Sequence, residues 1–236
     1  MSAKGHTSAS KEHRNLRFPD RATAGRALAA LLTAYRGRPG TVVLALPRGG
    51  VPVAFEVACA IGAPLDLMFV RKIGVPGEEE LAMGAIAEGG LRVLHHDLAK
   101  VIPISPDLLA QITEKALSEI ARQTHMYRGE RPPPDLRGRT VILVDDGLAT
   151  GTTMRAAISA ARRHAPAQII VAAPVAAPET VVSLRPLVDE IVVVETPDSL
   201  SAIGLWYVDF AQLRDDEVLT LLQRAAELLA RDAKNL

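Results

Sequence analysis

The amino-acid sequence predicts an α/β fold, in which a parallel sheet carries helices on both faces. Strands are expected at 41–46, 140–146, 168–175 and 190–195, because each contains a short run of branched apolar residues without the polar alternation of a half-exposed strand. Segments with apolar residues at helical spacing lie between these runs, so strand and helix alternate along the chain. Glycine and proline mark the ends of several runs, as in "LPRGG" after the first.

The first part of the chain is expected to hold a polar arm and two helices. Residues 1–17 lack the apolar core of a signal peptide and are predicted to be a flexible arm, ahead of a domain over 18–236. Asp20 is expected to cap the first helix, whose apolar positions follow at helical spacing. The second helix, "VPVAFEVACAIG", follows the strand at 41–46. Cys59 lies among its small apolar residues and is expected to be a buried thiol.

The middle of the chain departs from the regular alternation of apolar strands and helices. After a further apolar strand, "LDLMFV", the segment "RKIGVPGEEE" is charged, carries glycine and is interrupted by proline, so it is predicted to be a mobile loop. "LAMGAIA" and "LRVLHH" are expected to pair as strands around the turn "EGG". Ser105 as a cap and Pro106 at the first helical position then predict the start of a long amphipathic helix.

The second half returns to alternating strands and helices. A helix in "GTTMRAAISAARRH" follows the strand at 140–146, and a short helix from Pro178 separates the last two strands. A final helix is expected to begin with a cap near Asp215.

Composition and charge exclude several classes of function. The chain has 27 Lys and Arg against 27 Asp and Glu, so its formal net charge is zero and no global basic field is available for nucleic acid. No window approaches the roughly 20 apolar residues of a membrane span. A single cysteine cannot form an internal disulfide, which fits a reducing compartment. We therefore expect a cytoplasmic protein without nucleic-acid or membrane partners.

The stretch "VILVDDGLATGTTM" combines two carboxylates with a hydroxyl-rich loop. Asp145 and Asp146 stand at the carboxyl end of a predicted strand, where parallel sheets bind ligands. The loop after them leads directly into a helix, whose N-terminal N–H groups favour a phosphate. Carboxylates do not hold that same phosphate, and instead accept hydrogen bonds from sugar hydroxyls or face a magnesium ion. A ribose with a phosphate attached satisfies both halves of the motif.

Three alternatives compete with this interpretation. A P-loop requires a lysine in G-x-x-x-x-G-K-[ST], and a dinucleotide site requires G-x-G-x-x-G; neither pattern occurs in the chain. A plain strand end, capped by Asp and Thr without a ligand, stays open.

The motif resembles the phosphoribosyl pyrophosphate signature of type I phosphoribosyltransferases, and the resemblance extends over about 41–194. It implies the parallel-sheet type I fold with a small hood, a Mg²⁺ cofactor and a homodimer. By carry-over, Asp145 and Asp146 would hold the ribose hydroxyls and face the metal through water. The 5′-phosphate would be surrounded by Ala149, Thr150, Gly151, Thr152 and Thr153.

Two further segments match the family in order. "LPRGGVPVA" lies where the family binds pyrophosphate, so Arg48, Gly49 and Gly50 are the expected contacts, with a cis peptide before or after Arg48. Arg71 and Lys72 match the start of the catalytic loop, where they would stabilise charge on the departing pyrophosphate. The alternatives are a surface turn and a solvated charge cluster. Glu78–Glu80 are expected to be either solvated or a general base.

The acceptor base is the least determined feature. Ala149 stands where enzymes for 6-oxopurines usually carry Asp, which argues against a hypoxanthine–guanine enzyme. The hood is expected over about 91–137 and in the tail at 198–236. Trp206 and Tyr207 would stack on the base and Asp209 would face an exocyclic amine. Alternatively, Trp206 and Phe210 anchor the last helix.

These features together predict a transferase that moves the phosphoribosyl group from phosphoribosyl pyrophosphate to a nitrogenous base and releases pyrophosphate. Two rival functions use the same pocket. One is a sensor of phosphoribosyl pyrophosphate or a nucleotide without catalysis. The other is a hydrolase of a phosphorylated sugar or nucleotide.

Overall fold

The computed structural model describes residues 17–75, 78–94 and 105–234. Its centre is a five-stranded sheet in the order β2-β1-β6-β7-β8, and every neighbouring pair in it is parallel. The predicted α/β fold with a parallel sheet is therefore confirmed. The strands of this sheet are β1 (Thr41–Ala45), β2 (Leu65–Leu67), β6 (Thr140–Val144), β7 (Gln168–Val175) and β8 (Glu190–Glu195).

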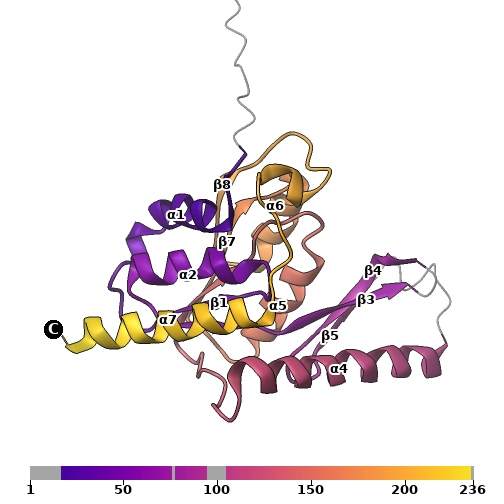
Figure 1. Ribbon diagram of the computed structural model, residues 1–236. Coiled ribbons are helices and arrows are strands. Elements are labelled where there is room, and N and C mark those ends of the chain that lie inside the picture. Colours follow the sequence, from indigo (N-terminus) through magenta and orange to yellow (C-terminus); the bar gives the residue numbers. More distant parts are fainter. Residues whose placement is uncertain (1–16, 76–77, 95–104, 235–236) are drawn as a thin grey trace, which may run out of the picture.

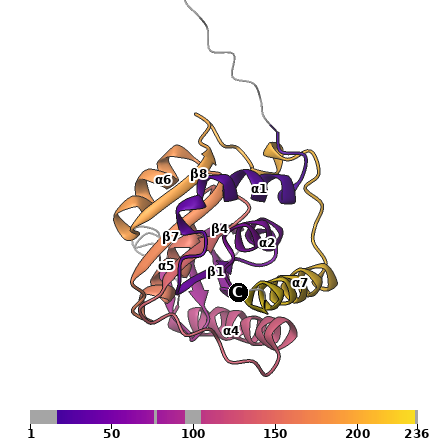
Figure 2. The same ribbon diagram turned by 90° about the vertical axis from the view of Figure 1, so that its left-hand side faces the viewer.

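Helices cover both faces of this sheet, as Figure 2 shows. Alternate residues of β6 join different cores: Ile142 and Val144 pack on the α2 side, whereas Val141 and Leu143 pack on the α5 side. Burial on both faces explains why β6 is apolar from Val141 to Val144. The helices of the first side are α1 (Arg21–Leu31), the 3-10 turn η1 (Thr33–Tyr35), α2 (Gly50–Ile61) and α7 (Asp215–Lys234); those of the other side are α5 (Thr152–Arg162), α6 (Pro178–Leu184) and the turn η2 (Arg185–Leu187).

A second sheet extends from the body with α4 (Pro106–Arg128) running alongside it (Figure 1). It consists of β3 (Val70–Val75), β4 (Glu78–Ala87) and β5 (Arg92–Leu94), and both neighbouring pairs are antiparallel. The predicted pairing of strands around "EGG" is confirmed as far as Leu94. His95 and His96, which end the predicted strand "LRVLHH", lie outside the described residues.

The predicted mobile loop "RKIGVPGEEE" is wrong for most of its length. Arg71 pairs with Ile86 and Lys72 with Ala85, so the segment enters an antiparallel hairpin. Its charges do not prevent this, because Ile73 is fully buried while the Lys72 side chain stays exposed. Residues 76–77 lie outside the described residues.

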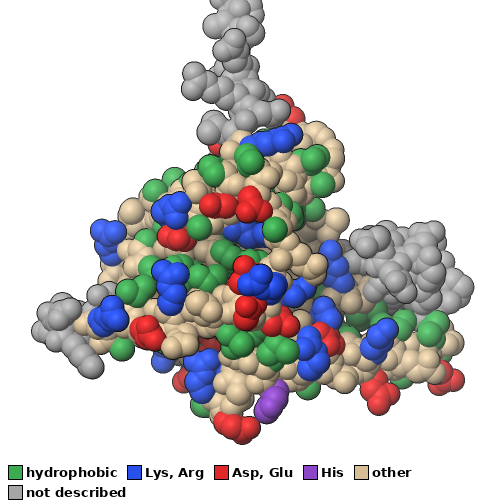
Figure 3. All heavy atoms as spheres, in the orientation of Figure 1, with side chains coloured by type: hydrophobic (Ala, Val, Ile, Leu, Met, Phe, Trp, Pro, Cys, Tyr) green, Lys and Arg blue, Asp and Glu red, His purple; other side chains and the backbone are tan. Residues whose placement is uncertain are grey.

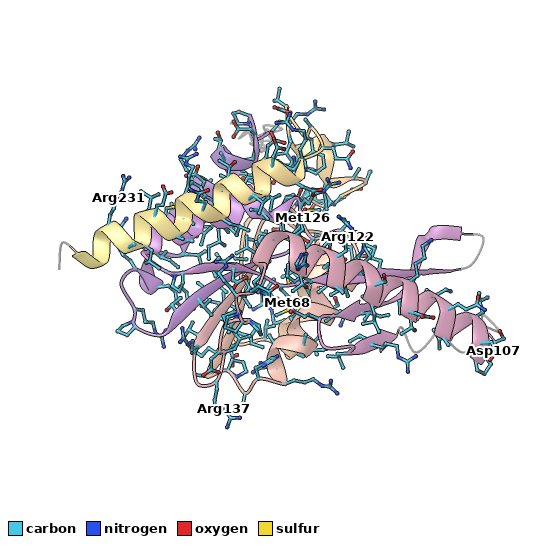
Figure 4. The ribbon with its side chains drawn as sticks, turned by 60° about the horizontal axis from the view of Figure 1, so that its bottom comes forward. Met68, Asp107, Arg122, Met126, Arg137 and Arg231 are labelled. Carbon is cyan, nitrogen blue, oxygen red and sulfur yellow. The ribbon has the colours of Figure 1, made fainter. Side chains whose placement is uncertain are left out.

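The predicted helix starts are confirmed by their caps. The Asp20 carboxylate accepts a hydrogen bond from the Thr23 N–H at 2.6 Å. The Ser105 hydroxyl accepts one from the Leu108 N–H at 3.2 Å, with Pro106 at the first helical position of α4. Figure 4 shows the length of α4, from Asp107 near its start to Met126 near its end.

Cys59 is exposed, so the prediction of a buried thiol is wrong. Ala58 and Ile61 of the same helix are buried against the sheet, and Cys59 lies on a different side of α2. A run of small apolar residues does not reveal which residue faces the core. Cys59 borders a cavity of about 140 Å³ between α2 and α7.

Two observations bear on the predicted partners. On the face shown in Figure 3, basic and acidic side chains are interspersed. Among the residues described, no helix has the length and apolar character needed to cross a bilayer.

Candidate functional site

The candidate site lies where the order of the strands reverses. From β1 the chain moves outward to β2, and from β6 it moves the other way to β7 and β8. The loops after β1 and β6 therefore flank one crevice at the carboxyl ends of the strands, which is where open α/β sheets bind ligands. One loop carries Arg48, Gly49 and Gly50, and the other carries Asp145 and Asp146.

The two loops touch, and glycine makes this possible. A Cβ atom added to Gly49 would lie 2.1 Å from Oδ2 of Asp146, and one added to Gly50 would lie 2.7 Å from the carbonyl oxygen of Val144. No side chain fits at either distance. The peptide between Pro47 and Arg48 is cis, which is one of the two positions that the resemblance implied. The predicted pyrophosphate loop thus lies directly against the acidic pair.

Burial and like charge perturb the acidic pair. Loss of solvent raises the pKa of Asp145 well above its ordinary value, and the neighbouring Asp146 charge raises it further; Lys72 and Arg21 act in the opposite direction. Burial also raises the pKa of Asp146, against the lowering effect of its hydrogen bond to Arg21. Two adjacent carboxylates of this kind need cations or hydroxyl donors nearby, which a bound sugar or metal supplies.

Arg21 is a site residue that the sequence interpretation missed. Its Nε donates to Oδ2 of Asp146 at 2.8 Å across 125 positions of sequence, and both side chains are 11% exposed. The chain offers one weak signal for it. Arg21 is the first residue of α1, where a positive charge opposes the helix dipole, so the residue is there for another reason.

The hydroxyl loop forms the start of α5. Gly151 precedes the helix with a φ of 71° and offers no side-chain oxygen to the first N–H groups of the helix. The hydroxyls of Thr150 and Thr152 lie 3.2 Å apart. Thr180 of α6, a second residue that was missed, donates its hydroxyl to the carbonyl of Ala149. A Cβ on Gly151 would lie 2.7 Å from Cγ2 of Thr180, so α6 packs closely against the loop.

Thr153 completes the predicted phosphate loop. It is the second residue of α5, within the first turn, and is partly exposed. The structure therefore gathers the predicted phosphate-binding residues at one helix N-terminus, beside the acidic pair.

Arg71 and Lys72 diverge, because neighbouring side chains on a strand point to opposite faces. Lys72 is close enough to the acidic pair to lower the pKa of Asp145. Arg71 is turned toward α4, where its guanidinium lies 3.0 Å from Oε1 of Glu119. Glu119 also pairs with Arg122 at 2.8 Å, which Figure 4 marks on α4. Of these two basic residues, Lys72 is therefore the one whose charge acts on the acidic pair.

Arg48 connects the pyrophosphate loop to two distant helices. Its guanidinium lies 3.6 Å from Oδ1 of Asp215, the first residue of α7. The Tyr127 hydroxyl near the end of α4 donates to the same carboxylate oxygen. The end of α4 and the start of α7 therefore meet beside this loop.

The aromatic segment of the tail lies against the acidic pair. It begins in the 3-10 turn η3 (Ile203–Trp206), and the buried Tyr207 donates its hydroxyl to the carbonyl of Asp146 at 2.6 Å. Phe18 and Ala24 form an apolar cluster with Tyr207, onto which Trp206 and Phe210 pack. The aromatic residues thus fasten the start of α1, whereas the alternative interpretation had assigned Trp206 and Phe210 to the last helix.

The remaining residues predicted for the base pocket are more open. Trp206 is partly buried and lines a cavity of about 190 Å³ with Arg17, Ser199, Ser201 and Leu205. The Asp209 carboxylate is exposed and accepts a hydrogen bond from the Ala211 N–H at 3.0 Å. Glu78–Glu80 begin β4, and their side chains lie outside what the structure describes.

Comparison with known proteins gives a family for this arrangement. Residues 17–201 match the family model described as "Phosphoribosyl transferase domain". Two relatives from Mycobacterium tuberculosis, strains CDC 1551 and H37Rv, are both named "Putative phosphoribosyl transferase" and are 43% identical over 208 residues. The alignment covers 88% of this chain and 47% of each relative. The chain therefore spans about half the length of the curated relatives it matches.

A solved structure is similar over nearly its whole length. It is the crystal structure of the protein TT1426 from Thermus thermophilus, which is 40% identical, with a TM-score of 0.75 over 88% of this chain and 98% of that one. These matches confirm the family and the type I fold that the motif predicted. The chain belongs to the phosphoribosyl transferase domain family.

Proposed function

We propose that this chain transfers the phosphoribosyl group of phosphoribosyl pyrophosphate to a nitrogenous base. The observation that carries the proposal is the contact between the glycine loop after β1 and the acidic pair after β6, beside the N-terminus of α5. A ligand with a ribose between two phosphate groups matches this order. The helix N-terminus would take the 5′-phosphate, the acidic pair the ribose hydroxyls, and the glycine loop the pyrophosphate.

The proposed reaction exchanges one bond at C1 of the ribose for another. The bond to the pyrophosphate oxygen breaks and its electron pair leaves with pyrophosphate, while a base nitrogen forms the new bond and gives up its proton. Negative charge therefore grows on the departing group. We expect Arg48 in the glycine loop and Lys72 on β3 to offset that charge. Arg71 would do so only after leaving Glu119.

Magnesium is the proposed cofactor, and the residues present fit it. Asp145 and Asp146 supply the carboxylate oxygens that a hard cation prefers. Within the described ranges, no cluster of three or more His, Cys, Asp or Glu side chains is arranged to hold a metal. Magnesium suits such an incomplete site, because it commonly binds through one or two carboxylates together with water and substrate phosphates. When bound, it would neutralise charge on the pyrophosphate.

The acceptor is proposed only as a nitrogenous base, within a hood built from about 91–137 and 198–236. Ala149 supports an acceptor other than hypoxanthine or guanine. Trp206 offers a partly exposed aromatic face, whereas Tyr207 is already engaged with Asp146. A homodimer in the cytoplasm, without nucleic-acid or membrane partners, remains part of the proposal.

Calorimetric titration of magnesium phosphoribosyl pyrophosphate into the protein tests the proposal. We expect micromolar binding that the Asp145→Asn, Asp146→Asn double variant loses. Asp107→Asn is the matched control, since it removes the same kind of charge at the far end of α4 (Figure 4). A panel of nucleobases would then be assayed for pyrophosphate release. Binding without release from any base would favour the sensor, and release of phosphate or pyrophosphate without a base would favour the hydrolase. No binding would contradict the proposal.

A further inference from the structure

Arg21 fastens the acidic pair to two other parts of the chain. Its Nε donates to Oδ2 of Asp146 at 2.8 Å, and its Nη1 donates to the carbonyl of Ala211 at 3.0 Å. The guanidinium carbon lies 3.8 Å from the centre of the Phe210 ring and 5.9 Å from that of Tyr207. One side chain thus joins the first turn of α1, the tail and the acidic pair through charge, hydrogen bonds and stacking.

Asp146 is held from three directions. Arg21 binds its carboxylate, the Tyr207 hydroxyl binds its carbonyl at 2.6 Å, and Gly49 lies so close that a Cβ there would be 2.1 Å from Oδ2. Its side chain is 11% exposed. A carboxylate with these contacts has little freedom to turn toward a ligand.

Asp145 differs from its neighbour. It is partly exposed, and its Oδ1 accepts the N–H of Asp146 at 2.9 Å, within the same turn of the backbone. Of the two aspartates, Asp145 is therefore better placed to accept a hydrogen bond from a sugar, through its second carboxylate oxygen. Adjacent carboxylates repel each other, and the guanidinium of Arg21 on Asp146 reduces this repulsion.

We infer that Arg21 is a positioning residue that acts through Asp146: it holds that carboxylate against the glycine loop and leaves Asp145 to meet the ribose hydroxyls. This inference rests on the proposed function and divides the roles of its acidic pair. A lysine would replace the charge of Arg21 but not the planar fork that reaches Asp146 and Ala211 together.

A double-mutant cycle tests the inference by binding, with magnesium phosphoribosyl pyrophosphate as the probe. Arg21→Met is expected to raise the dissociation constant about tenfold or more. The Arg21→Met, Asp146→Asn double variant is expected to bind no more weakly than Asp146→Asn alone, because both changes remove one contact. Arg21→Lys is expected to recover part of the affinity.

Arg26→Met is the matched control. Arg26 lies on the same helix and pairs with Glu56 at 3.2 Å, but its side chain is 57% exposed and its partner belongs to α2. This variant is expected to bind the probe like the wild type. Denaturant unfolding of every variant checks that it folds. The Asp146→Asn variant keeps Arg21 and its packing against the tail.

Two outcomes would overturn the inference while leaving the proposed function intact. One is an Arg21→Met protein that binds the probe as tightly as the wild type. The other is a cycle in which the Arg21→Met and Asp146→Asn losses multiply, which would mean that Arg21 acts on the fold and not through Asp146. If the wild-type protein itself does not bind the probe, the proposed function fails and the inference fails with it.

Discussion

At the scale of single residues, the candidate site depends on glycines, which have no Cβ atom. Gly49 and Gly50 lack the Cβ that would collide with the loop after β6, so two loops from different strands meet at van der Waals distance. Gly151 does the same for the hydroxyl loop, where Thr180 occupies the space that a side chain would take. These contacts bring the glycine loop and the hydroxyl loop beside the carboxylates of Asp145 and Asp146.

Replacing Gly49 with alanine tests this close approach. Because the new Cβ would lie 2.1 Å from Oδ2 of Asp146, the carboxylate or the loop has to move. We expect a loss of roughly 1–3 kcal/mol in the free energy of unfolding, as for other overpacked positions, and at least about tenfold weaker binding of magnesium phosphoribosyl pyrophosphate. Denaturant melts and calorimetry measure the two effects.

Gly37→Ala is the control for this variant. Gly37 has a φ of 63° and open space around it, so alanine there costs backbone strain without displacing a neighbour. It is expected to lower stability and leave ligand binding unchanged. Equal ligand affinity in the Gly49→Ala and wild-type proteins would show that ligand binding does not depend on the close approach of Gly49 to Asp146.

At the scale of elements, the β3–β4 hairpin separates two neighbouring basic side chains. Successive residues of a strand point to opposite faces, so Arg71 pairs with Glu119 of α4, whereas the charge of Lys72 acts on Asp145. The sequence shows only two neighbouring basic residues, and in a loop either side chain could turn toward the site. In a strand the two side chains point to opposite faces.

Lys72→Gln is therefore expected to impair turnover more than Arg71→Gln does. Loss of a cation that offsets charge on the leaving group costs about 100-fold or more in rate, which pyrophosphate release measures with whichever base proves active. Arg122→Gln is the control, since Arg122 pairs with Glu119 at 2.8 Å but is 51% exposed and lies on α4. A Lys72→Gln enzyme with wild-type turnover would exclude Lys72 from catalysis.

At the scale of the whole molecule, the three tyrosines join elements that are distant in sequence. Tyr35 donates to Glu190 of β8, Tyr127 to Asp215 of α7, and Tyr207 to the backbone of Asp146. Burial and these acidic neighbours raise the pKa of all three phenols, that of Tyr35 to about 12 from 10.0.

A spectrophotometric titration of the folded protein near 295 nm tests these pKa values. Because the folded state binds the phenolic protons more tightly than the unfolded chain, their contribution to stability is complete below pH ~10 and declines as pH rises through the folded pKa values. At pH ~11 we expect little tyrosinate in the folded protein and nearly complete ionisation after unfolding in guanidinium. Half-ionisation of a folded tyrosine near pH ~10 would show that its hydrogen bond is not formed in solution.

Much of the architecture was predictable because it depends on local sequence patterns. Continuous apolar runs indicated the buried strands of the main sheet, and Asp20 and Ser105 indicated helix starts, since burial and capping depend on a few neighbouring residues. The same holds for the loop around Asp145 and Asp146, whose residue types alone indicate a phosphate beside a sugar. The sequence by itself therefore determined the fold class and most of its elements, whereas the ligand of its central loop stays a prediction.

The tertiary structure decided the features that depend on distant partners. Ile73 and its neighbours form a strand because β4 pairs with them, and Cys59 is exposed because another side of α2 faces the sheet. Arg21 meets Asp146 across 125 positions, and Gly49 contacts the same carboxylate, only because the strand order sets β1 beside β6. Long-range pairing is a property of the whole packed chain, so no local pattern reports it.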